Sequence, residues 1–488
     1  MSTKKIGLLL GPLLFVLTLM FFNPNGLNDP SKAVLASTLW IAVWWITEAL
    51  PIAVTALLPI VLFPLTGGMD ITATTAAYGH KFVFLIMGGF FIAIAIEKWN
   101  LHKRIALNII YFIGTDIKKI ILGFMVATAF LSMWISNTAT SVMMLPIGIV
   151  IIKQLKDNPL TEEYENLIFG KSLMLAIAYS ASIGGIATLI GTPPNMVMAG
   201  IISQNYNYEI SFLEWFIFGF PLMILLLFIC WLYLTRWAFS FKQNTFLGGR
   251  AEIIRLRNRL GKITYEQKAV TVVFALAGIC WITRSFFLQT IFPSMDDTII
   301  AIFFALVLFV LNAKNKNERI LRWKEAVKMP WGILLLYGGG MSLAKAFETS
   351  GLALWVGKQF TAFGAFHLLI LLLLLVAAIN FLTEVTSNLA TTAMLLPVLA
   401  PIALEFDLHP FVLMAAAAVA ASCAFMLPVA TPPNAVVFGS GYLRIPDMVR
   451  KGFFLNLISI IIIALVVYFC LPTLWDLDPD KFPEVLLN

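Results

Sequence analysis

Two segments of the sequence repeat the same short polar pattern inside apolar surroundings. The first, Ser-Asn-Thr at 136–138, stands in WISNTATSVMMLPI, and the second, Ser-Asn-Leu at 387–389, stands in EVTSNLATTAMLLPV. Over the twelve positions that start at Ser136, seven residues recur identically after a shift of 251. Each copy is followed by a Thr-Pro-Pro-Asn element, at 192–195 and 431–434. A repeated pattern of this length indicates that the four elements have a common function.

The residue types in these elements suit the binding of small ions. Ser, Thr and Asn offer short hydroxyl and amide groups, and paired prolines stop a helix. A helix that is interrupted in its middle presents free N–H groups at one new end, which attract anions, and free carbonyls at the other, which coordinate small cations together with hydroxyls. No Arg or Lys stands beside the four elements. A dianion bound here would therefore rely on hydroxyls, amides, backbone dipoles and, as one option, a co-bound cation.

A simpler interpretation is that these polar side chains only hold helices together, as is common in membrane bundles. That would be the better interpretation of one isolated Ser-Asn-Thr. Two copies in register, each followed by Thr-Pro-Pro-Asn, favour a binding function.

The elements that must position these residues are apolar helices in a lipid bilayer. Of 488 residues, 60% are hydrophobic and only 12% are charged, and a soluble protein of this length could not cover such a surface with polar groups. The net charge of +7 raises nucleic acid as another partner, but the basic residues stand in short loops between apolar runs, as in the cytoplasmic loops of membrane proteins. The sequence therefore predicts an all-α polytopic protein of the cytoplasmic membrane that binds no nucleic acid.

Eleven apolar stretches have the length expected of transmembrane helices. Two further stretches, 119–153 and 365–404, contain the Ser-Asn elements in their middles. The basic loops all fall on the side of Lys4 and Lys5, taken as cytoplasmic, only if both stretches enter the membrane and return. We therefore expect two re-entrant hairpins that open from opposite faces, with the N-terminus inside and the C-terminus outside. The expected spans are about 6–23, 35–49, 51–66, 81–98, 169–201, 212–235, 268–288, 297–313, 331–348, 411–441 and 452–472.

The same topology predicts two repeats of opposite orientation. Gly88 and Glu97 recur as Gly339 and Glu348, again after 251 positions, in spans that are expected to run in opposite directions. Inverted repeats with interrupted helices near the midplane are typical of secondary transporters. The expected segments are a leading helix and loop (1–34), a first repeat (35–235), a basic cytoplasmic linker (236–267), a second repeat (268–472) and an acidic external tail (473–488).

Other polar residues are weaker candidates for a functional role. Lys345, Glu97 and Glu348 lie in apolar runs, where an ionisable group is often functional, although the two glutamates stand near span ends and could equally act as caps. Glu384 precedes the second Ser-Asn element and could orient the tip of its hairpin.

Amphipathic segments at about 100–116 and 349–362 connect a span to each hairpin. They could be interfacial arms between a fixed and a moving part, or passive connectors. The four histidines fall at predicted span ends, and neither they nor the four cysteines form a ligand set. H-E-x-x-H, Walker-type and G-x-S-x-G motifs are absent from the sequence, so neither a membrane protease nor an ATP-driven pump is expected.

With these motifs, the chain resembles the divalent anion:sodium symporter family over nearly its whole length. The resemblance rests on the paired Ser-Asn tips, the paired Thr-Pro-Pro-Asn breaks and the two inverted repeats after one leading helix. It implies a homodimer with a scaffold domain and an elevator-type transport domain. It also implies dicarboxylate substrates such as succinate, malate, fumarate or 2-oxoglutarate, and no cofactor apart from a role for Na⁺ in some members.

The resemblance also implies which residues bind, position by position. Substrate carboxylates would be bound by Ser136, Asn137, Thr138, Ser387, Asn388, Thr431 and Pro432. Sodium would be bound by Ser132, Ser136, Asn137 and Gly185 at a first site, and by Thr383, Thr386, Asn388 and Ala430 at a second. Two residues depart from the family pattern, since Leu389 stands in place of a threonine and Ile186 in place of a small polar residue.

These departures leave the coupling open between sodium symport and exchange of one dicarboxylate for another. An inorganic divalent anion such as sulfate is an alternative substrate for the same kind of pocket, and an anion channel is a further alternative. The sequence ranks neither the dicarboxylates nor the stoichiometries.

Overall fold

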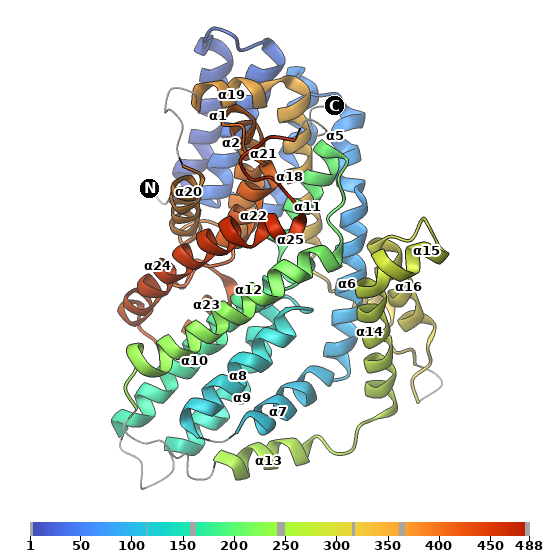
Figure 1. Ribbon diagram of the computed structural model, residues 1–488, viewed down its shortest axis with the longest axis vertical. Coiled ribbons are helices and arrows are strands. Elements are labelled where there is room, and N and C mark those ends of the chain that lie inside the picture. Colours follow the sequence, from blue (N-terminus) through green and yellow to red (C-terminus); the bar gives the residue numbers. More distant parts are fainter. Residues whose placement is uncertain are drawn as a thin grey trace.

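The structure, a computed structural model, describes residues 3–114, 116–156, 163–241, 249–314, 318–360 and 367–483. Within these ranges the chain forms helices joined by turns and loops, and no β-strand apart from one isolated bridge (Figure 1). The predicted all-α class is therefore confirmed. Parts of the predicted segments lie outside the described residues, namely 1–2, 115, 157–162, 242–248, 315–317, 361–366 and 484–488.

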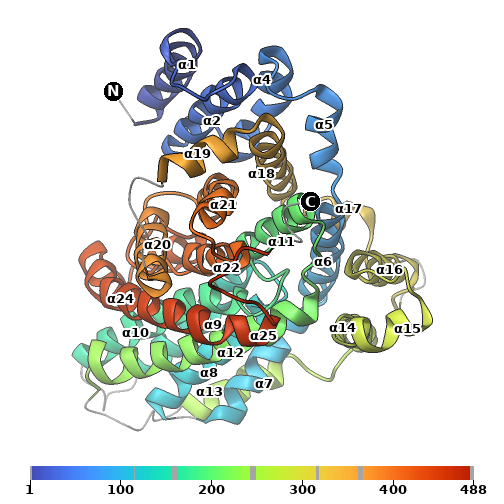
Figure 2. The same cartoon turned by 45° about the horizontal axis from the view of Figure 1, so that its top comes forward.

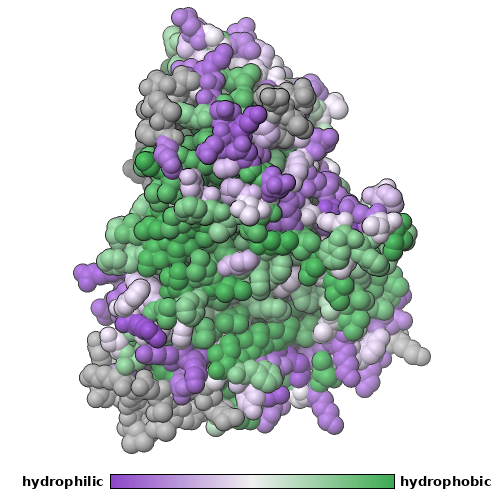
Figure 3. Space-filling model, viewed as in Figure 1, coloured by the Kyte–Doolittle hydropathy of each residue, from purple (hydrophilic) through white to green (hydrophobic). Residues whose placement is uncertain are grey.

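Apolar helices dominate the described chain. Seven of its helices are long and apolar enough to cross a membrane: Thr3–Phe21, Ile71–Lys98, Glu165–Gly185, Phe212–Ala238, Tyr265–Ile291, Asn388–Glu405 and Ile445–Phe469. Figure 3 shows a broad band of hydrophobic side chains across the middle of one face, between more hydrophilic ends. The chain is thus an integral membrane protein, whereas the eleven crossings and their directions stay predictions.

The first half of the chain, up to the linker, contains both early polar elements. Its elements are α1 (Thr3–Phe21), α2 (Asp29–Thr47), α3 (Ile52–Thr55), α4 (Leu58–Thr66), α5 (Ile71–Ala76), η1 (Ala77–Gly79), α6 (Lys81–Lys98), α7 (Leu101–Ile113), α8 (Ile117–Ser132), α9 (Asn137–Lys156), α10 (Glu163–Gly185), α11 (Pro193–Tyr206), α12 (Phe212–Leu232) and the π-helical η2 (Tyr233–Ala238). The first Ser-Asn element forms the turn between α8 and α9, as predicted for a hairpin tip.

The second half of the chain, from the linker onward, contains both later polar elements. It contains α13 (Gly249–Arg259), α14 (Tyr265–Thr283), the π-helical η3 (Arg284–Leu288), α15 (Gln289–Ile291), α16 (Asp297–Val310), α17 (Trp323–Ala326), α18 (Trp331–Ser350), α19 (Leu352–Phe360), α20 (Leu368–Thr383), α21 (Asn388–Glu405), α22 (Pro410–Ala421), α23 (Pro432–Phe438), α24 (Ile445–Phe469) and α25 (Leu471–Trp475). The second Ser-Asn element forms the turn between α20 and α21.

The two predicted spans that contain the Thr-Pro-Pro-Asn elements are interrupted, as expected, but the place of the prolines needs correction. The spans 169–201 and 411–441 are each two helices, with non-helical backbone at 186–192 between α10 and α11 and at 422–431 between α22 and α23. The prolines were expected to stop the preceding helix, but Pro193 and Pro432 are instead the first residues of the helix that follows. Proline is tolerated there because the N–H that it lacks has no partner in the first turn of a helix.

Two other groups of helices border the helices that carry the polar elements. α14, α15 and α16 stand beside α6 in both views, and α1 and α2 lie together near α19 (Figures 1 and 2). α8, α9 and α12 each pack on α10, while α20 packs on α22 and α24. The largest fully buried side chains include Trp215 beside the first break and Trp281 on α14.

The weaker candidates take structural positions. Lys345 and Glu348 form an ion pair of 3.0 Å within α18, and both side chains are more than one third exposed. Glu97 lines a second cavity of about 630 Å³ at the end of α6. The predicted amphipathic segments are helical as α7 and α19 within the described residues. His80, His367 and His409 cap the N-termini of α6, α20 and α22, which confirms their predicted place at helix ends.

Candidate functional site

The four polar elements meet at one cavity of about 760 Å³. Its lining includes 136–138 and 191–194 from the first half of the chain, and 385–389 and 428–433 from the second. All seven residues predicted to bind substrate line it: Ser136, Asn137, Thr138, Ser387, Asn388, Thr431 and Pro432. The structure thus brings together elements that are separated by up to about 300 positions in the sequence.

Four helices begin at this cavity. α9 starts at Asn137, α21 at Asn388, α11 at Pro193 and α23 at Pro432, and each of these residues lines it. The first N–H groups of a helix have no partner within the helix, and the helix dipole adds partial positive charge at that end. The cavity is therefore suited to an anion, although no Lys or Arg stands among the described residues that line it.

Helix C-termini lie behind the two tips. Three of the residues predicted to bind sodium, Ser132, Gly185 and Thr383, are the last residues of α8, α10 and α20. They do not line the cavity, whereas Thr386 and Ala430 do. The last carbonyls of a helix are free of helical hydrogen bonds and carry partial negative charge. Each tip therefore places free carbonyls and hydroxyls close to the N-terminus of the next helix.

At the first tip, Asn137 is held by Ser132. The Ser132 hydroxyl donates to the Ala181 carbonyl at 2.6 Å and lies 2.7 Å from the Asn137 side-chain amide. Since this hydroxyl has one proton, Asn137 turns its NH₂ group toward it, and the same NH₂ lies 3.3 Å from the carbonyl oxygens of Ala181 and Gly191. The tip is thereby tied to both sides of the break that follows α10.

Gly185 is required by this arrangement. A Cβ atom at Gly185 would lie 2.8 Å from the side-chain amide of Asn137 and 3.0 Å from the carbonyl oxygen of Gly191. At Gly184, a Cβ would lie 2.5 Å from the carbonyl oxygen of Ala129 in α8. Only residues without a side chain allow the end of α10 to approach the tip this closely.

At the second tip a threonine takes the place of the serine, and its hydroxyl donates to the Asn side chain instead of accepting from it. Thr383 Oγ1 donates to Oδ1 of Asn388 at 2.8 Å and lies 3.2 Å from the Ala421 carbonyl oxygen. Thr386 Oγ1 and Thr391 Oγ1 are 2.6 Å apart and buried, which fixes the turn before α21. Both Asn side chains are thus oriented by a hydroxyl five residues earlier.

The two breaks are also closed in the same way. In the first, Asn195 Nδ2 donates to the carbonyls of Gly185 (3.3 Å) and Thr188 (2.9 Å). In the second, Asn434 Nδ2 donates to the carbonyls that stand ten and seven residues earlier, at 3.3 and 3.0 Å. The last residue of each Thr-Pro-Pro-Asn element therefore holds the loop that precedes it.

The groups that support the two breaks differ. At the first, the Trp215 indole donates to the Ile186 carbonyl at 2.9 Å, and the Thr188 hydroxyl donates to the Met133 carbonyl at 2.6 Å. At the second, the Glu384 carboxylate accepts from the backbone N–H groups of 425, 426 and 427 at 2.8 to 2.9 Å, and from Asn456 Nδ2 at 2.7 Å. Glu384 was expected to orient its own tip, but it holds the neighbouring break instead.

The two departures from the family pattern have different consequences. The Leu389 side chain lines the cavity and removes a hydroxyl from it. The Ile186 side chain is fully buried, and this residue serves the site through its carbonyl. Its side-chain type therefore has no direct effect on the cavity.

Sequence reasoning missed the wall that faces the tips. It is formed by residues of α2, α3, α6 and α18 and is apolar except for the end of α2: Trp45, Ile46, Thr47, Glu48, Ile52, Ile86, Phe90, Ile333 and Leu336. Glu48 is the one charged residue among the described lining residues, and its carboxylate lies 3.7 Å from Lys4 Nζ. In the sequence these residues look like ordinary parts of apolar spans, so no local signal marks them.

Comparison with known proteins assigns nearly the whole chain to one family. Residues 2–475 match the family model described as the sodium:sulfate symporter transmembrane region. The chain is 50% identical to the sodium-dependent dicarboxylate transporter SdcS of Staphylococcus aureus (strain USA300), over 98% of this chain and 93% of the relative. It is 47% identical to SdcS of Staphylococcus saprophyticus, over 97% and 93% of the two chains.

Two solved structures are similar in fold. Neisseria gonorrhoeae MtrF, described as illuminating a class of antimetabolite efflux pumps, superposes with a TM-score of 0.59 at 13% identity and covers 96% of each chain. The Alcanivorax borkumensis YdaH transporter superposes with a TM-score of 0.56 at 13% identity, over 93% of this chain and all of the other. The similarity in sequence along nearly the full length agrees with the prediction of a transporter rather than an enzyme. The chain belongs to the divalent anion:sodium symporter family.

Proposed function

We propose that this protein is a secondary transporter that carries C4–C5 dicarboxylates, such as succinate, malate, fumarate or 2-oxoglutarate, together with sodium ions. The observation that carries the proposal is the meeting of both Ser-Asn tips and both Thr-Pro-Pro-Asn breaks at one cavity without a basic residue in its described lining. The names of the staphylococcal relatives, which describe sodium-dependent dicarboxylate transporters, support it.

The substrate's two carboxylates would be bound by the two halves of the site. Ser136, Asn137 and Thr138 form one half. Ser387, Asn388, Thr431 and Pro432 form the other, and the Ser387 hydroxyl makes no capping hydrogen bond within α21. Hydroxyls, amides and free N–H groups at helix starts are the donors that a carboxylate accepts from. A solute with one carboxylate at each end would use both halves at once.

Sodium ions would supply the positive charge that the protein lacks. The first ion would be bound by Ser132, Ser136, Asn137 and Gly185, and the second by Thr383, Thr386, Asn388 and Ala430, where helix C-termini and hydroxyls gather. Burying a dianion in a site of low dielectric constant without counter-charge is costly. Each sodium ion therefore strengthens substrate binding and substrate strengthens sodium binding, because such a coupling is reciprocal. We accordingly favour symport over exchange.

Alternating access would follow from the two halves of the chain. Each half contains a hairpin and a broken helix with matching hydrogen bonds, as an inverted repeat requires. We propose that 35–235 and 268–472 are these repeats, that the tips move as part of an elevator-type transport domain, and that the protein forms a homodimer. The N-terminus would face the cytoplasm and the C-terminus the outside, in line with the basic linker and the acidic tail.

Purified protein in liposomes tests the proposal. An inward sodium gradient should drive accumulation of labelled succinate in empty vesicles, and replacement of sodium by choline should abolish it. Uptake that needs internal dicarboxylate and ignores sodium would establish exchange instead of symport. Lack of succinate and 2-oxoglutarate uptake under both conditions would refute dicarboxylate transport.

Sulfate is the second candidate because the description of the matching family model names it. The competition experiment separates the two substrates. Unlabelled succinate should suppress the uptake of labelled succinate, and sulfate at the same concentration should leave it unchanged. Suppression by sulfate alone would assign the site to the inorganic anion.

A further inference from the structure

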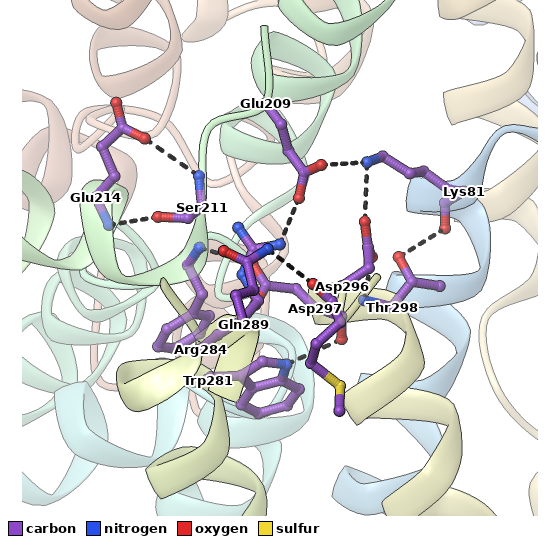
Figure 4. Close-up of polar contacts among 12 residues, drawn as sticks. Lys81, Glu209, Ser211, Glu214, Trp281, Arg284, Gln289, Asp296, Asp297 and Thr298 are labelled. Carbon is purple, nitrogen blue, oxygen red and sulfur yellow. Dashed lines mark hydrogen bonds and ion pairs between the residues drawn. The ribbon is translucent and has the colours of Figure 1, made fainter. Parts of the chain in front are cut away.

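A cluster of five charged side chains joins two groups of helices away from the cavity. Lys81 starts α6, Arg284 starts the π-helical η3 after α14, and Asp296 and Asp297 stand at the start of α16. Glu209 comes from the short connection between α11 and α12. Figure 4 shows its carboxylate between the two cations. The first four residues stand at the ends of α6, α14 and α16 or directly beside them. These three helices pack on one another, and we call them the frame.

Glu209 belongs to the part of the chain that carries the binding elements. α11 starts at the first Thr-Pro-Pro-Asn element, and α12 packs on α8 and α10. The connection is held in place at its end by a capping box, in which the Ser211 hydroxyl accepts from the Glu214 N–H and the Glu214 carboxylate accepts from the Ser211 N–H (Figure 4). Glu209 stands two residues before this capping box, so we take it to move with α12.

The Glu209 carboxylate contacts both cations of the frame. Its Oε2 lies 2.5 Å from Lys81 Nζ, and its Oε1 lies 2.6 Å from Arg284 Nη1. Charge-assisted hydrogen bonds of this length are the stronger kind in proteins. These two contacts are directional, so they fix one position of the connection against the frame.

The frame keeps its charges paired without Glu209. Lys81 also pairs with Asp296 at 2.9 Å, and Arg284 also pairs with Asp297 at 3.2 Å. Two cations and two carboxylates remain if Glu209 leaves, and the half-exposed Glu209 side chain (33%) is close enough to water to be solvated. Breaking a buried pair is costly when it leaves a charge without a partner. Detachment of Glu209 leaves Lys81 and Arg284 each with one carboxylate partner, so its free-energy cost is small enough for a reversible contact.

The contact between the frame and the helices that carry the binding elements extends from Glu209 to the first tip through stacked aromatic rings. Trp134, two residues before Ser136, stacks on Trp281 of α14 and on Phe212 of α12, with ring centroids 6.3 and 5.9 Å apart. The Trp281 indole donates to the Asp297 carbonyl at 3.1 Å, and Asp297 Oδ2 accepts from the Phe212 N–H at 2.8 Å. Stacked rings tolerate lateral displacement better than directional ion pairs do. The directional contacts that select one position are thus the two ion pairs of Glu209 and the hydrogen bond from the Phe212 N–H to Asp297.

We propose that Glu209 is a latch: its carboxylate holds the α11–α12 connection against Lys81 and Arg284 in this conformation, and it detaches when the cavity is carried to the other membrane face. The proposal rests on the proposed alternating access, but not on the identity of the substrate. The latch biases which face the cavity opens to, and it contributes nothing to the binding of the solute itself.

Cysteine labelling measures this bias without substrate. In a variant whose four native cysteines are replaced, Val429→Cys places a thiol at the cavity, since Val429 lines it and is 78% exposed. The ratio of labelling rates by a membrane-impermeant reagent from the two faces then reports the ratio of the two conformations. Glu209→Gln should shift this ratio by about fivefold away from the present conformation, as expected for loss of partly exposed charge-assisted contacts.

A second variant should shift the ratio the opposite way. Asp296→Asn keeps an N-cap residue at α16 but leaves Lys81 with Glu209 as its carboxylate partner, which strengthens the latch. Glu348→Gln is the matched control, because it removes an exposed ion pair of 3.0 Å inside a single helix, and it should leave the ratio unchanged.

The outcomes decide separately about the latch and about the transported solute. Equal ratios in the unsubstituted background and in Glu209→Gln would overturn the latch, as would a shift of the same sign in Asp296→Asn. A shift in Glu209→Gln with no succinate uptake by the unsubstituted protein would support the latch and refute the proposed substrate. Labelling from one face only, in every variant, would contradict alternating access and with it the latch.

Discussion

The two halves of the site hold their tips alike and their breaks differently. At both tips a hydroxyl on the last helical residue orients an Asn five positions later. At the first break, neutral donors from Trp215 and Thr188 satisfy free carbonyls. At the second break, the Glu384 carboxylate satisfies free N–H groups.

The difference places a buried negative charge beside one half of the site only. Glu384 is 3% exposed, and no Lys or Arg pairs with it in the part of the chain that the structure describes. Four N–H donors compensate the carboxylate locally, as they can for a buried acid. Two binding elements of the same kind can therefore be supported by groups of opposite polarity. A cation near the second tip is stabilised more by the surrounding charge than a cation near the first tip.

The largest effect is expected where the halves are the same. Asn137→Ala or Asn388→Ala should each reduce sodium-driven succinate uptake by at least about 100-fold. Each Asn lines the cavity and is hydrogen-bonded to the hydroxyl that contacts the neighbouring break. Thermal unfolding in detergent should show a folded protein in both cases. Uptake at the original rate in either variant would mean that the motif only packs helices.

A large difference in stability is expected between the two breaks. Glu384→Leu leaves three donors without an acceptor, the N–H groups of 426 and 427 and the Asn456 amide, at about 1–3 kcal/mol each. The 425 N–H keeps Asn456 Oδ1 as an acceptor at 3.2 Å. The midpoint of thermal unfolding should therefore fall by many degrees. Trp215→Phe leaves one carbonyl short of a donor and should cost about 1–3 kcal/mol in total. The ranking is checked by parallel unfolding curves, and equal losses for the two variants would remove the distinction between the breaks.

A moderate effect on sodium dependence should separate charge from shape at the second break. Glu384→Gln keeps the size of the side chain but removes its charge, and we expect the sodium concentration for half-maximal uptake to rise by about three- to tenfold. The first-break variant Trp215→Phe serves as the control and should leave this concentration unchanged. An unchanged sodium requirement in Glu384→Gln would show that the carboxylate has a purely structural role.

The smallest effect is expected at the third residue of the Ser-Asn elements, where the two tips differ in sequence (Thr138 and Leu389). Leu389→Thr adds a hydroxyl to the cavity and should lower the KM for succinate by about two- to fivefold, as expected for one additional hydrogen bond. The reciprocal change, Thr138→Leu, should raise KM at the first tip. Initial uptake rates over a range of succinate concentrations measure both, and a higher KM in Leu389→Thr would contradict a productive hydroxyl there.

Much of the site could be predicted from the sequence because its signals are local. A polar tetrapeptide with two prolines inside an apolar run indicates an interrupted helix. Its repetition, together with that of the Ser-Asn pattern, predicts both tips and both breaks from the sequence alone. The position of the prolines at helix starts was missed, because the sequence marks an interruption without showing on which side of it the proline lies.

Contacts between distant segments could not be predicted in the same way. Three contacts each join parts of the chain that are at least about 40 positions apart. Glu384 accepts from the N–H groups of 425–427, Trp134 stacks on Trp281, and Glu209 pairs with Lys81 and Arg284. No hydrophobic period or motif encodes which of many polar groups will face one another. The apolar wall with Glu48 opposite the tips belongs to the same class.

The sequence by itself determined the membrane class, the all-helical fold, the four interruptions and the residue types available to bind an anion with cations. These follow from hydropathy, backbone chemistry and repetition, which act over a few neighbouring residues. Only the tertiary structure decided that the interruptions share one cavity, which polarity supports each break, and which charge sits on the boundary with the frame. Those outcomes depend on how buried polar groups find partners across helices, and burial without a partner is the cost that selects among the arrangements.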